Sequence, residues 1–550
     1  MPNTEQEKPM AHAPQSPNND EKKYLDHRAS YSKGMKQSAP GIVDADTYSA
    51  FAKAVGGFDP VSKTFTNPVG TADFDTQPLL GGNRKLNGPL GAFGRSIAGT
   101  NPDGFGNHVV PPAPELERAE YATELVELYW ASLLRDTPFG LYVDDPDSVV
   151  AGIVDIKARA EAQDQLDLAR CAVAELDANK GTYAGPLDGG KVTLKTLFRG
   201  GGGKFGSQRN QTWFHGEEFG PYISQFCVTP TALGAVPITP VCQSYAKGVD
   251  YMTNFNAWKD VQKGAKPAEP ALGDMAYLHD GRGLGAYTRV DELYQAYFVA
   301  YLVMKTLTVP TNPGNPYEHT NFGNAQPFGT FGGPDIASTL GTVAKLALNV
   351  VWYQKWVVHR RHRPESGGGL VHMLLTGQAS QFKNPDLKLH DIILESEAVK
   401  ASAKLNGNSF LLSQAFPEGS PTHPAYPTGH GAVAGACITI LKFFFKNDFV
   451  IPKPLVTSLF GNPAEPPALY TGADKGKITV NGELHKLAHN ISFGHGIHPG
   501  IHWRGDTDYS VTLGEAVALD FLRAEAHKYR ERFSVDIVKA DGNKVTISNA

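Results

Sequence analysis

The chain has 550 residues, 41% of them hydrophobic, and a formal net charge of −5 at pH 7. This hydrophobic content supports a packed core and excludes global disorder, and so small a charge gives no reason to expect a nucleic-acid partner. The four cysteines lack CxxC spacing, which argues against a disulfide framework or a cysteine zinc site. Charged residues interrupt the longest apolar stretches, so we expect no membrane-spanning segment. No apolar signal segment is visible at the N-terminus, which favours a cytoplasmic location and leaves a periplasmic or secreted one open.

The N-terminal part of the chain is poor in apolar residues. Residues 1–45 are rich in Pro, Asn, Glu, Lys and Ser and are predicted to form a flexible tail, and residues 46–550 a single domain. Residues 56–112 carry many Gly, Pro and Asn residues and are predicted to be extended and irregular. Prolines from Pro111 to Pro114 then introduce a helix whose apolar residues recur at three- and four-residue spacing as far as Leu133.

The rest of the chain is predicted to be mainly α-helical. Apolar periodicity predicts helices over 286–307, 335–360, 389–403, 430–446 and 510–530. The Pro- and Gly-rich stretch 310–334 is predicted to be a long loop and, because such loops are often functional, a pocket rim. Residues 533–549 alternate apolar and polar residues around Asp541-Gly542, which predicts a small C-terminal β-hairpin.

A basic segment at residues 355–364 carries the first candidate site residues. Lys355 and Arg363 are eight positions apart, which on one continuous helix would bring both to the same face. Two fixed cations on one face can hold a multiply charged oxyanion. Taken alone, the segment reads more readily as a solvated basic face.

Two further segments carry candidate site residues: a turn before an apolar helix, and a histidine followed by an aspartate. Thr428-Gly429-His430 precedes an apolar helical run, and backbone N–H groups at a helix start favour anions. Gly429 permits close approach of a ligand, and His430 can exchange a proton near neutral pH. Further along, His502 lies four residues before Asp506, the spacing of a ligand histidine with a supporting carboxylate. Each piece alone also fits ordinary capping or core packing.

In this order, the pieces resemble the superfamily of vanadium-dependent haloperoxidases and type 2 phosphatidic-acid phosphatases. The detailed resemblance is to the bromoperoxidase type of algae and bacteria, carried by residues 352–365, 423–430 and 481–488. It extends from about residue 50 to the C-terminus. It implies two helical bundles packed in one large domain, with the vanadate site within residues 350–510.

The resemblance also implies roles for individual residues. Vanadate would be the cofactor, with phosphate able to replace it, and hydrogen peroxide, a halide and a small organic molecule the substrates. Vanadium would act as a Lewis acid toward peroxide, and attack by bromide would release hypobromous acid. Family members commonly form homo-oligomers. The implied site residues are the metal ligand His502, the vanadate-binding Lys355, Arg363, Thr428 and Gly429, and the catalytic His430, His423 and Asp291.

His423 is relevant to halide preference, and Thr428 to the binding of the oxyanion. A histidine seven residues before His430 resembles the bromoperoxidase type, so bromide is the expected halide, although His423 equally fits a plain turn residue before Pro424. Thr428 stands where the family usually has serine, and it keeps the hydroxyl.

One family residue is missing. The arginine expected six residues before the ligand histidine is replaced by Gly496, or by His495 if the flanking Phe493-Gly494 is aligned instead. We expect His495 or His498 to substitute as a cation when protonated, which would make oxyanion binding pH-dependent. Asp291 resembles the acid that pairs with the missing arginine, and a carboxylate left there would raise the pKa of a nearby histidine.

Two alternatives to a haloperoxidase remain open. The same cradle can hold phosphate, and the histidine would then be the nucleophile of a phosphomonoesterase. The missing arginine also fits an altered, non-halogenating protein that only binds an oxyanion.

Overall fold

The computed structural model describes residues 23–56, 58–59, 64–65, 84–93, 108–201, 212–318, 323–381 and 387–549. Helices are the main secondary structure of these residues, and the strands pair only into two-stranded sheets. The longer helices are α4 (Ala119–Leu133), α6 (Ile156–Ala178), α11 (Gly333–Tyr353), α15 (Gly429–Phe444), α16 (Val480–Gly496) and α17 (Arg504–Ala526). The shorter ones are α2 (Ala45–Gly56), α5 (Pro146–Ala151), α7 (Gln225–Val228), α8 (Phe255–Gln262), α9 (Gly281–Arg289), α10 (Gln295–Thr306), α12 (Pro364–Leu375), α13 (Asp391–Leu394) and α14 (Glu397–Leu405). The mainly α fold class is confirmed.

The small sheets lie at the periphery of the helices. The strand pairs are β1 (Gln37–Ala39) with β2 (Ile42–Val43), β3 (Phe58–Asp59) with β4 (Thr64–Phe65), β5 (Thr231–Leu233) with β6 (Val236–Ile238), β7 (Val241–Tyr245) with β8 (Leu272–Tyr277), and β9 (Leu455–Val456) with β10 (Ala468–Leu469). The predicted C-terminal hairpin is confirmed as β11 (Ser534–Val538) and β12 (Lys544–Ser548), with Gly542 at a positive φ of 81° in its turn.

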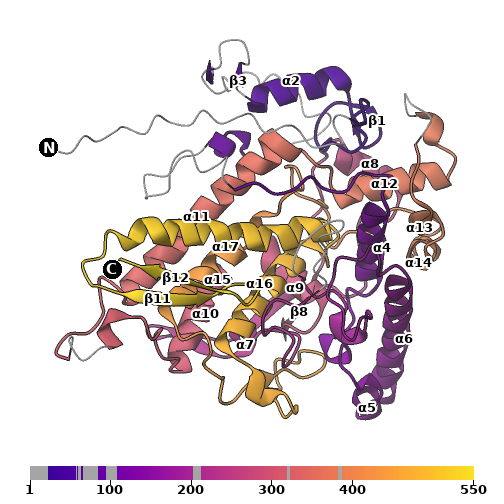
Figure 1. Ribbon diagram of the computed structural model, residues 1–550. Coiled ribbons are helices and arrows are strands. Elements are labelled where there is room, and N and C mark those ends of the chain that lie inside the picture. Colours follow the sequence, from indigo (N-terminus) through magenta and orange to yellow (C-terminus); the bar gives the residue numbers. More distant parts are fainter. Residues whose placement is uncertain are drawn as a thin grey trace.

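The helices form two packed groups, as Figure 1 shows. In one, α15 contacts α11, α16 and α17, and α9 and α10 pack beside them. In the other, α4 packs against α6, α12, α13 and α14. Every residue of α15 is buried, which explains why this helix is apolar on all sides.

Helices α15 and α17 cross unusually closely because of two glycines. A Cβ on Gly435 would lie 1.9 Å from the Val511 carbonyl oxygen, and a Cβ on Gly514 would lie 1.9 Å from that of Ala432. This crossing brings the start of α15 against the first turns of α17, where the backbone N–H of Thr428 donates to Ser510 Oγ at 2.8 Å. Two segments with candidate site residues are thereby fixed to each other.

Helix α11 and the π-helix η8 (Gln354–His359) that continues it form the longest apolar span in the described residues. By length and composition this span could cross a membrane, and half of it is buried inside the protein. It packs against α15 and α17, so its apolar character is accounted for by the core that it helps to form.

Three expectations about the chain need correction. Residues 23–45 are not a flexible tail, because Ala29, Tyr31 and Ile42 are buried and Lys33 forms an ion pair with Glu365; residues 1–22 lie outside the described residues. The helix expected over 286–307 is instead two helices, broken where Val290 is 85% exposed. None of the described residues of 310–334 lines the candidate site, so they do not form a rim of this cavity.

Candidate oxyanion site

A cavity of about 290 Å³ lies where several distant segments meet. Its wall includes four of the predicted histidines, together with Asp291 and Gly429. The histidines are His423, His430, His495 and His502. Lys355 and Arg363 lie directly behind this wall, fully buried. The structure therefore brings the predicted residues together, with the exception of His498.

Lys355 and Arg363 lie close together, but not because they share one face of a continuous helix. The helix does not continue through both residues: η8 ends at His359, its C-cap Arg360 has a φ of 41°, and Arg363 is the N-cap of α12. Both side chains instead reach the segment before Thr428. Lys355 Nζ donates to the carbonyl oxygens of Pro424 and Ala425 at 2.9 and 2.7 Å, and Arg363 Nε donates to that of His423 at 3.0 Å.

These two cations are buried with little compensating negative charge. Burial, and then the neighbouring Arg363 guanidinium, lowers the pKa of Lys355 well below its usual value, and burial lowers the pKa of Arg363 to about 10. Asp506 is the nearest opposing carboxylate, and it is already paired with Arg361 at 3.0 Å. A bound anion would relieve this imbalance because it stabilises the charged forms.

The start of α15 adds donors for an anion. Thr428 is its N-cap, and the buried Thr428 Oγ1 has no hydrogen-bond partner in the described part of the chain. A buried hydroxyl without a partner is costly, so an oxygen-rich ligand beside it would be favoured. A Cβ on the adjacent Gly429 would approach Leu348 Cδ1 to 3.2 Å, so this position has little room for a side chain.

His502 is held in the tautomer that leaves Nε2 available as a ligand. Its Nδ1–H donates to Asp506 Oδ2 at 2.9 Å, and Arg363 donates to its Nε2 at 2.9 Å. Burial, followed by the charges of Arg363 and Lys355, lowers the pKa of His502 well below its usual value. The ring therefore stays neutral, with a lone pair on Nε2. Asp506 lies in the first turn of α17 and is oriented in turn by Arg361.

His430 and His495 form a stacked pair in the cavity wall. Their rings stack with centroids 3.5 Å apart and an interplanar angle of 16°. His430 Nε2–H donates to Asp291 at 2.8 Å, and His495 Nδ1–H donates to the Thr288 carbonyl at 3.2 Å. Asp291 lies in the break between α9 and α10, so this break serves to place the carboxylate. Asp291, which was expected to pair with the missing arginine, is instead bonded to His430.

The surroundings of Gly496, His495 and His498 decide which residue can take the place of the missing arginine. A Cβ on Gly496 would lie 2.9 Å from His502 Cβ, so no side chain fits at that position. His495 faces the cavity, with its ring centroid 5.8 Å from that of His502. His498 is not part of the cavity wall and packs between Phe139 and Phe198, with centroids 5.4 and 5.6 Å away. Of the two predicted substitutes, the placement supports His495 alone.

His423 lies against Arg363 and Trp352. Arg363 donates to His423 Nδ1 at 2.9 Å, and the Trp352 ring lies 4.8 Å from the His423 ring. Burial, then the charges of Arg363 and Lys355, lowers the pKa of His423 well below its usual value. A neutral histidine and an indole at the cavity wall leave room for a small ion near the cation cluster.

Two arginines of the cavity wall were missed by sequence reasoning. Arg289 forms a two-bond ion pair with Glu418 at 2.7 and 2.8 Å, and Arg84 donates to the carbonyl oxygens of Glu418 and Ser420 at 3.0 and 3.4 Å. Arg84 adds a permanent positive charge to a wall that lacks the expected arginine. No spacing or motif marked it, because its segment meets the site only in the folded chain.

His498 itself gives a testable prediction about acid stability. Neither ring nitrogen has a partner among the described residues, and burial, then the charge of Arg135, lowers its pKa from 6.5 to about 3. Below its ordinary pKa the unfolded chain binds a proton that the folded chain rejects. The free energy of unfolding therefore falls as pH drops from 6.5 to about 3, by up to ~1.4 kcal/mol per pH unit.

His498→Phe is expected to remove this loss while filling the same aromatic environment. Urea unfolding would be measured at about pH 7 and about pH 4.5, and the difference should shrink by about 2 kcal/mol in the variant. An equal pH dependence in both proteins would show that His498 takes up its proton in the folded state.

The chain is similar to known proteins over most of its length. No family model matches the chain. It is 30% identical to the vanadium-dependent bromoperoxidase of Corallina officinalis, over 94% of this chain and 90% of the relative, and to that of Ascophyllum nodosum, over 92% and 84%. A homohexameric vanadate-dependent bromoperoxidase of Ascophyllum nodosum has the same fold, with a TM-score of 0.80 and 24% identity over 98% of this chain and 87% of the other. The chain belongs to the vanadium-dependent bromoperoxidase family.

Proposed function

We propose that this protein is a vanadate-dependent haloperoxidase that oxidises bromide with hydrogen peroxide to hypobromous acid. The observation that carries the proposal is the buried cluster of Lys355, Arg363 and neutral His502 beside a cavity, together with a Thr428 hydroxyl that has no partner among the described residues. Such a cluster combines buried positive charge with one imidazole lone pair, and these two features suit an oxyanion whose central metal takes a nitrogen ligand.

The residues present fit vanadate. Lys355 and Arg363 would neutralise its oxygens, and Thr428 Oγ1 and the Gly429 N–H would donate to them. His502 Nε2 would bind the metal, with Asp506 fixing the tautomer through Nδ1. When bound, vanadate supplies a Lewis acid that polarises hydrogen peroxide for attack by a halide.

His430 is the residue best placed to move protons. Its Nε2–H donates to Asp291, so in the neutral ring the lone pair is on Nδ1 and can accept a proton. Asp291 thereby orients the ring. His423, with Trp352, supports bromide as the halide.

The competing functions give different results in one assay. Vanadate-free protein would be supplied with vanadate, hydrogen peroxide and bromide, and bromination of a phenol dye followed; phosphate would then replace vanadate, and a chromogenic phosphate ester would be offered. Bromination that requires vanadate and disappears with phosphate is the expected result. Ester hydrolysis without bromination would identify a phosphomonoesterase, and neither activity would identify an oxyanion-binding protein.

His495→Ala is expected to weaken vanadate binding by about one to two decades, the equivalent of one charge-assisted hydrogen bond. Burial, then the charge of His430, lowers the pKa of His495, and a bound anion opposes both by stabilising the protonated ring. Its contribution is therefore present at low pH and is lost as pH rises.

The measurement is the ratio of wild-type to variant vanadate affinity between about pH 5 and about pH 9, because the ionisation of vanadate itself cancels in this ratio. The ratio should be largest in acid and approach one in base. His498→Phe, outside the cavity, is the matched control and should leave affinity unchanged. A ratio independent of pH would contradict the role of His495.

We also propose that the chain forms a homo-oligomer, since a protein of the same fold is homohexameric. Light scattering coupled to size exclusion tests this, and a monomer mass would contradict it. A cytoplasmic location stays a prediction, as does the organic substrate.

A further inference from the structure

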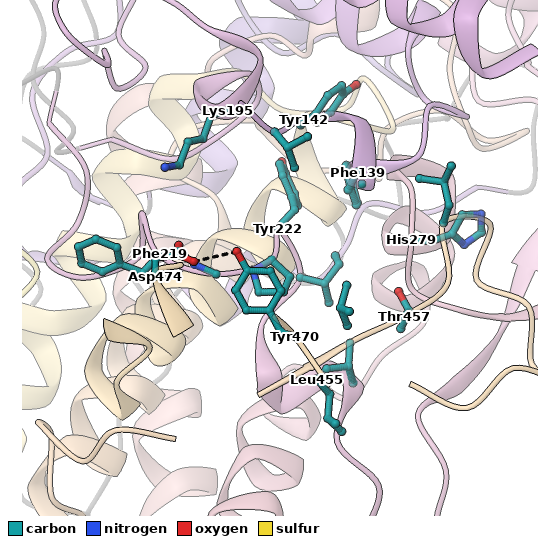
Figure 2. Close-up of a pocket in the computed structure, with 18 of the residues that line it drawn as sticks. Phe139, Tyr142, Lys195, Phe219, Tyr222, His279, Leu455, Thr457, Tyr470 and Asp474 are labelled. Atoms are coloured by element: carbon teal, nitrogen blue, oxygen red, sulfur yellow. Dashed lines mark hydrogen bonds between the residues drawn. The ribbon is translucent and has the colours of Figure 1, made fainter. Parts of the chain in front are cut away.

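We propose that a second cavity in this protein binds an aromatic anion, a ring compound that carries a carboxylate or phenolate. The cavity has a volume of about 500 Å³ and is distinct from the oxyanion site. We call it the aromatic cavity, defined by five aromatic side chains and two lysines. These are Phe139, Tyr142, Phe219, Tyr222, Tyr470, Lys195 and Lys477. Figure 2 shows most of them arranged around the space.

The walls of the aromatic cavity suit a flat ring. Phe139 and Tyr222 stack with centroids 4.0 Å apart and an interplanar angle of 7°, and Tyr142 meets Tyr222 edge-on at 6.0 Å. Tyr470 is fixed by its hydroxyl, which donates to Asp474 at 2.8 Å (Figure 2). Rings held in this way offer faces and edges for further stacking without losing conformational freedom. The volume lies within the ordinary range for small-molecule sites.

The charges around the aromatic cavity favour an anion. Its two acidic residues are already engaged: Asp474 accepts hydrogen bonds on both oxygens, from Gly220 N–H and Tyr470, and Asp144 lies 3.9 Å from Lys195 Nζ. Lys477 is exposed, and its Nζ lies 5.1 Å from the centre of the Phe219 ring.

The basic residues of the cavity are less fully paired. Within the part of the chain that the structure describes, neither Lys477 nor Arg199 has a carboxylate within ion-pair distance. The buried Arg199 guanidinium lies 3.9 Å from the centre of the Tyr222 ring. The lining therefore has excess positive charge beside aromatic faces, a combination that matches an aromatic ring with a negative substituent.

The aromatic cavity is joined to the oxyanion site by one helix. Leu278 and His279 of the cavity wall immediately precede α9, and Arg289 and Asp291 at its other end line the oxyanion site. Nine residues of helix span about 13 Å. A ligand in the aromatic cavity would thus lie within a short diffusion distance of that site, although its binding does not depend on the chemistry there.

The test uses the full-length protein saturated with vanadate, so that the oxyanion site is occupied. Binding of 1-naphthoate is measured by isothermal titration calorimetry, with neutral 1-naphthamide as the shape-matched control. Naphthoate should bind with a dissociation constant below about 1 mM and the amide at least about threefold more weakly. No binding of naphthoate, or equal binding of both compounds, would overturn the proposal.

Substitutions in and beside the aromatic cavity test whether naphthoate binds there. Lys477→Met should weaken naphthoate binding about three- to tenfold. The matched control is Lys475→Met, since Lys475 is an exposed lysine two residues away that does not line the cavity, and it should leave binding unchanged. Ala473→Trp, which adds bulk at a lining position, should weaken both compounds. Equal effects of the two lysine variants would show only diffuse surface attraction and would overturn the assignment, as would unchanged binding in Ala473→Trp.

Discussion

His502→Ala is expected to abolish vanadate-dependent bromination. The change removes the His502 Nε2 lone pair, which accepts from Arg363 at the wall of the oxyanion cavity, while Arg363 keeps its bonds to the carbonyl oxygens of His423 and Ile501. Losing an outer partner of a metal ligand costs 10- to 100-fold in affinity, so losing the ligand itself should cost more than about a hundredfold.

Vanadate binding and thermal stability would both be measured for His502→Ala. A ligand that binds only the folded state stabilises it by about 2.7 kcal/mol at a hundred times its dissociation constant, so the variant should lose this stabilisation at concentrations that saturate the wild type. His527→Ala, which changes an exposed histidine after α17, is the control and should behave as wild type. Wild-type vanadate binding in His502→Ala would mean that the metal ligand lies elsewhere.

His430→Ala is the second large effect, and it should separate turnover from binding. Proton transfer by a positioned side chain contributes about 10²- to 10⁴-fold, so turnover should fall by that amount. Vanadate affinity should stay within about tenfold of wild type, because Lys355, Arg363 and His502 remain in place.

Asp291→Asn provides the graded comparison for His430. The amide keeps the shape of the carboxylate 2.8 Å from His430 Nε2 but removes its negative charge, so the ring is held less firmly and turnover should fall, though less than in His430→Ala. If both variants lost vanadate binding but kept their rate per bound vanadate, the role of His430 would be to bind vanadate and not to transfer protons.

The two helical groups and the C-terminal hairpin follow from patterns within the sequence or from the resemblance that those patterns carry. Local periodicity locates α15 to within two residues and finds α17, which begins six residues before the expected start, and Asp541-Gly542 marks the hairpin turn. These features depend on neighbours in the chain, so sequence reasoning reaches them.

The site is harder because its residues meet through tertiary structure. Lys355 and Arg363 were assigned to one face of one helix, whereas the chain turns at Arg360 and the two side chains converge on the carbonyls before Thr428. Their proximity was expected correctly, but the expectation rested on one continuous helix, and the chain does not form one there. The π-helix and the left-handed residue have no periodic signature that a hydrophobic pattern could reveal.

The break between α9 and α10 was missed for a related reason. Val290 and Leu293 continue the apolar spacing of one helix, yet Val290 is exposed and the chain turns to present Asp291 to His430. A local rule fails there because a functional contact overrides it. Arg84 was missed because only the fold brings it to the cavity.

A crystal structure of the protein with vanadate bound tests the central claim most directly. We predict that vanadium bonds to His502 Nε2 and that the oxygens of vanadate contact Lys355, Arg363 and Thr428 Oγ1. Vanadate bound at another place, or an empty cavity in crystals whose protein brominates in a vanadate-dependent manner, would contradict the account.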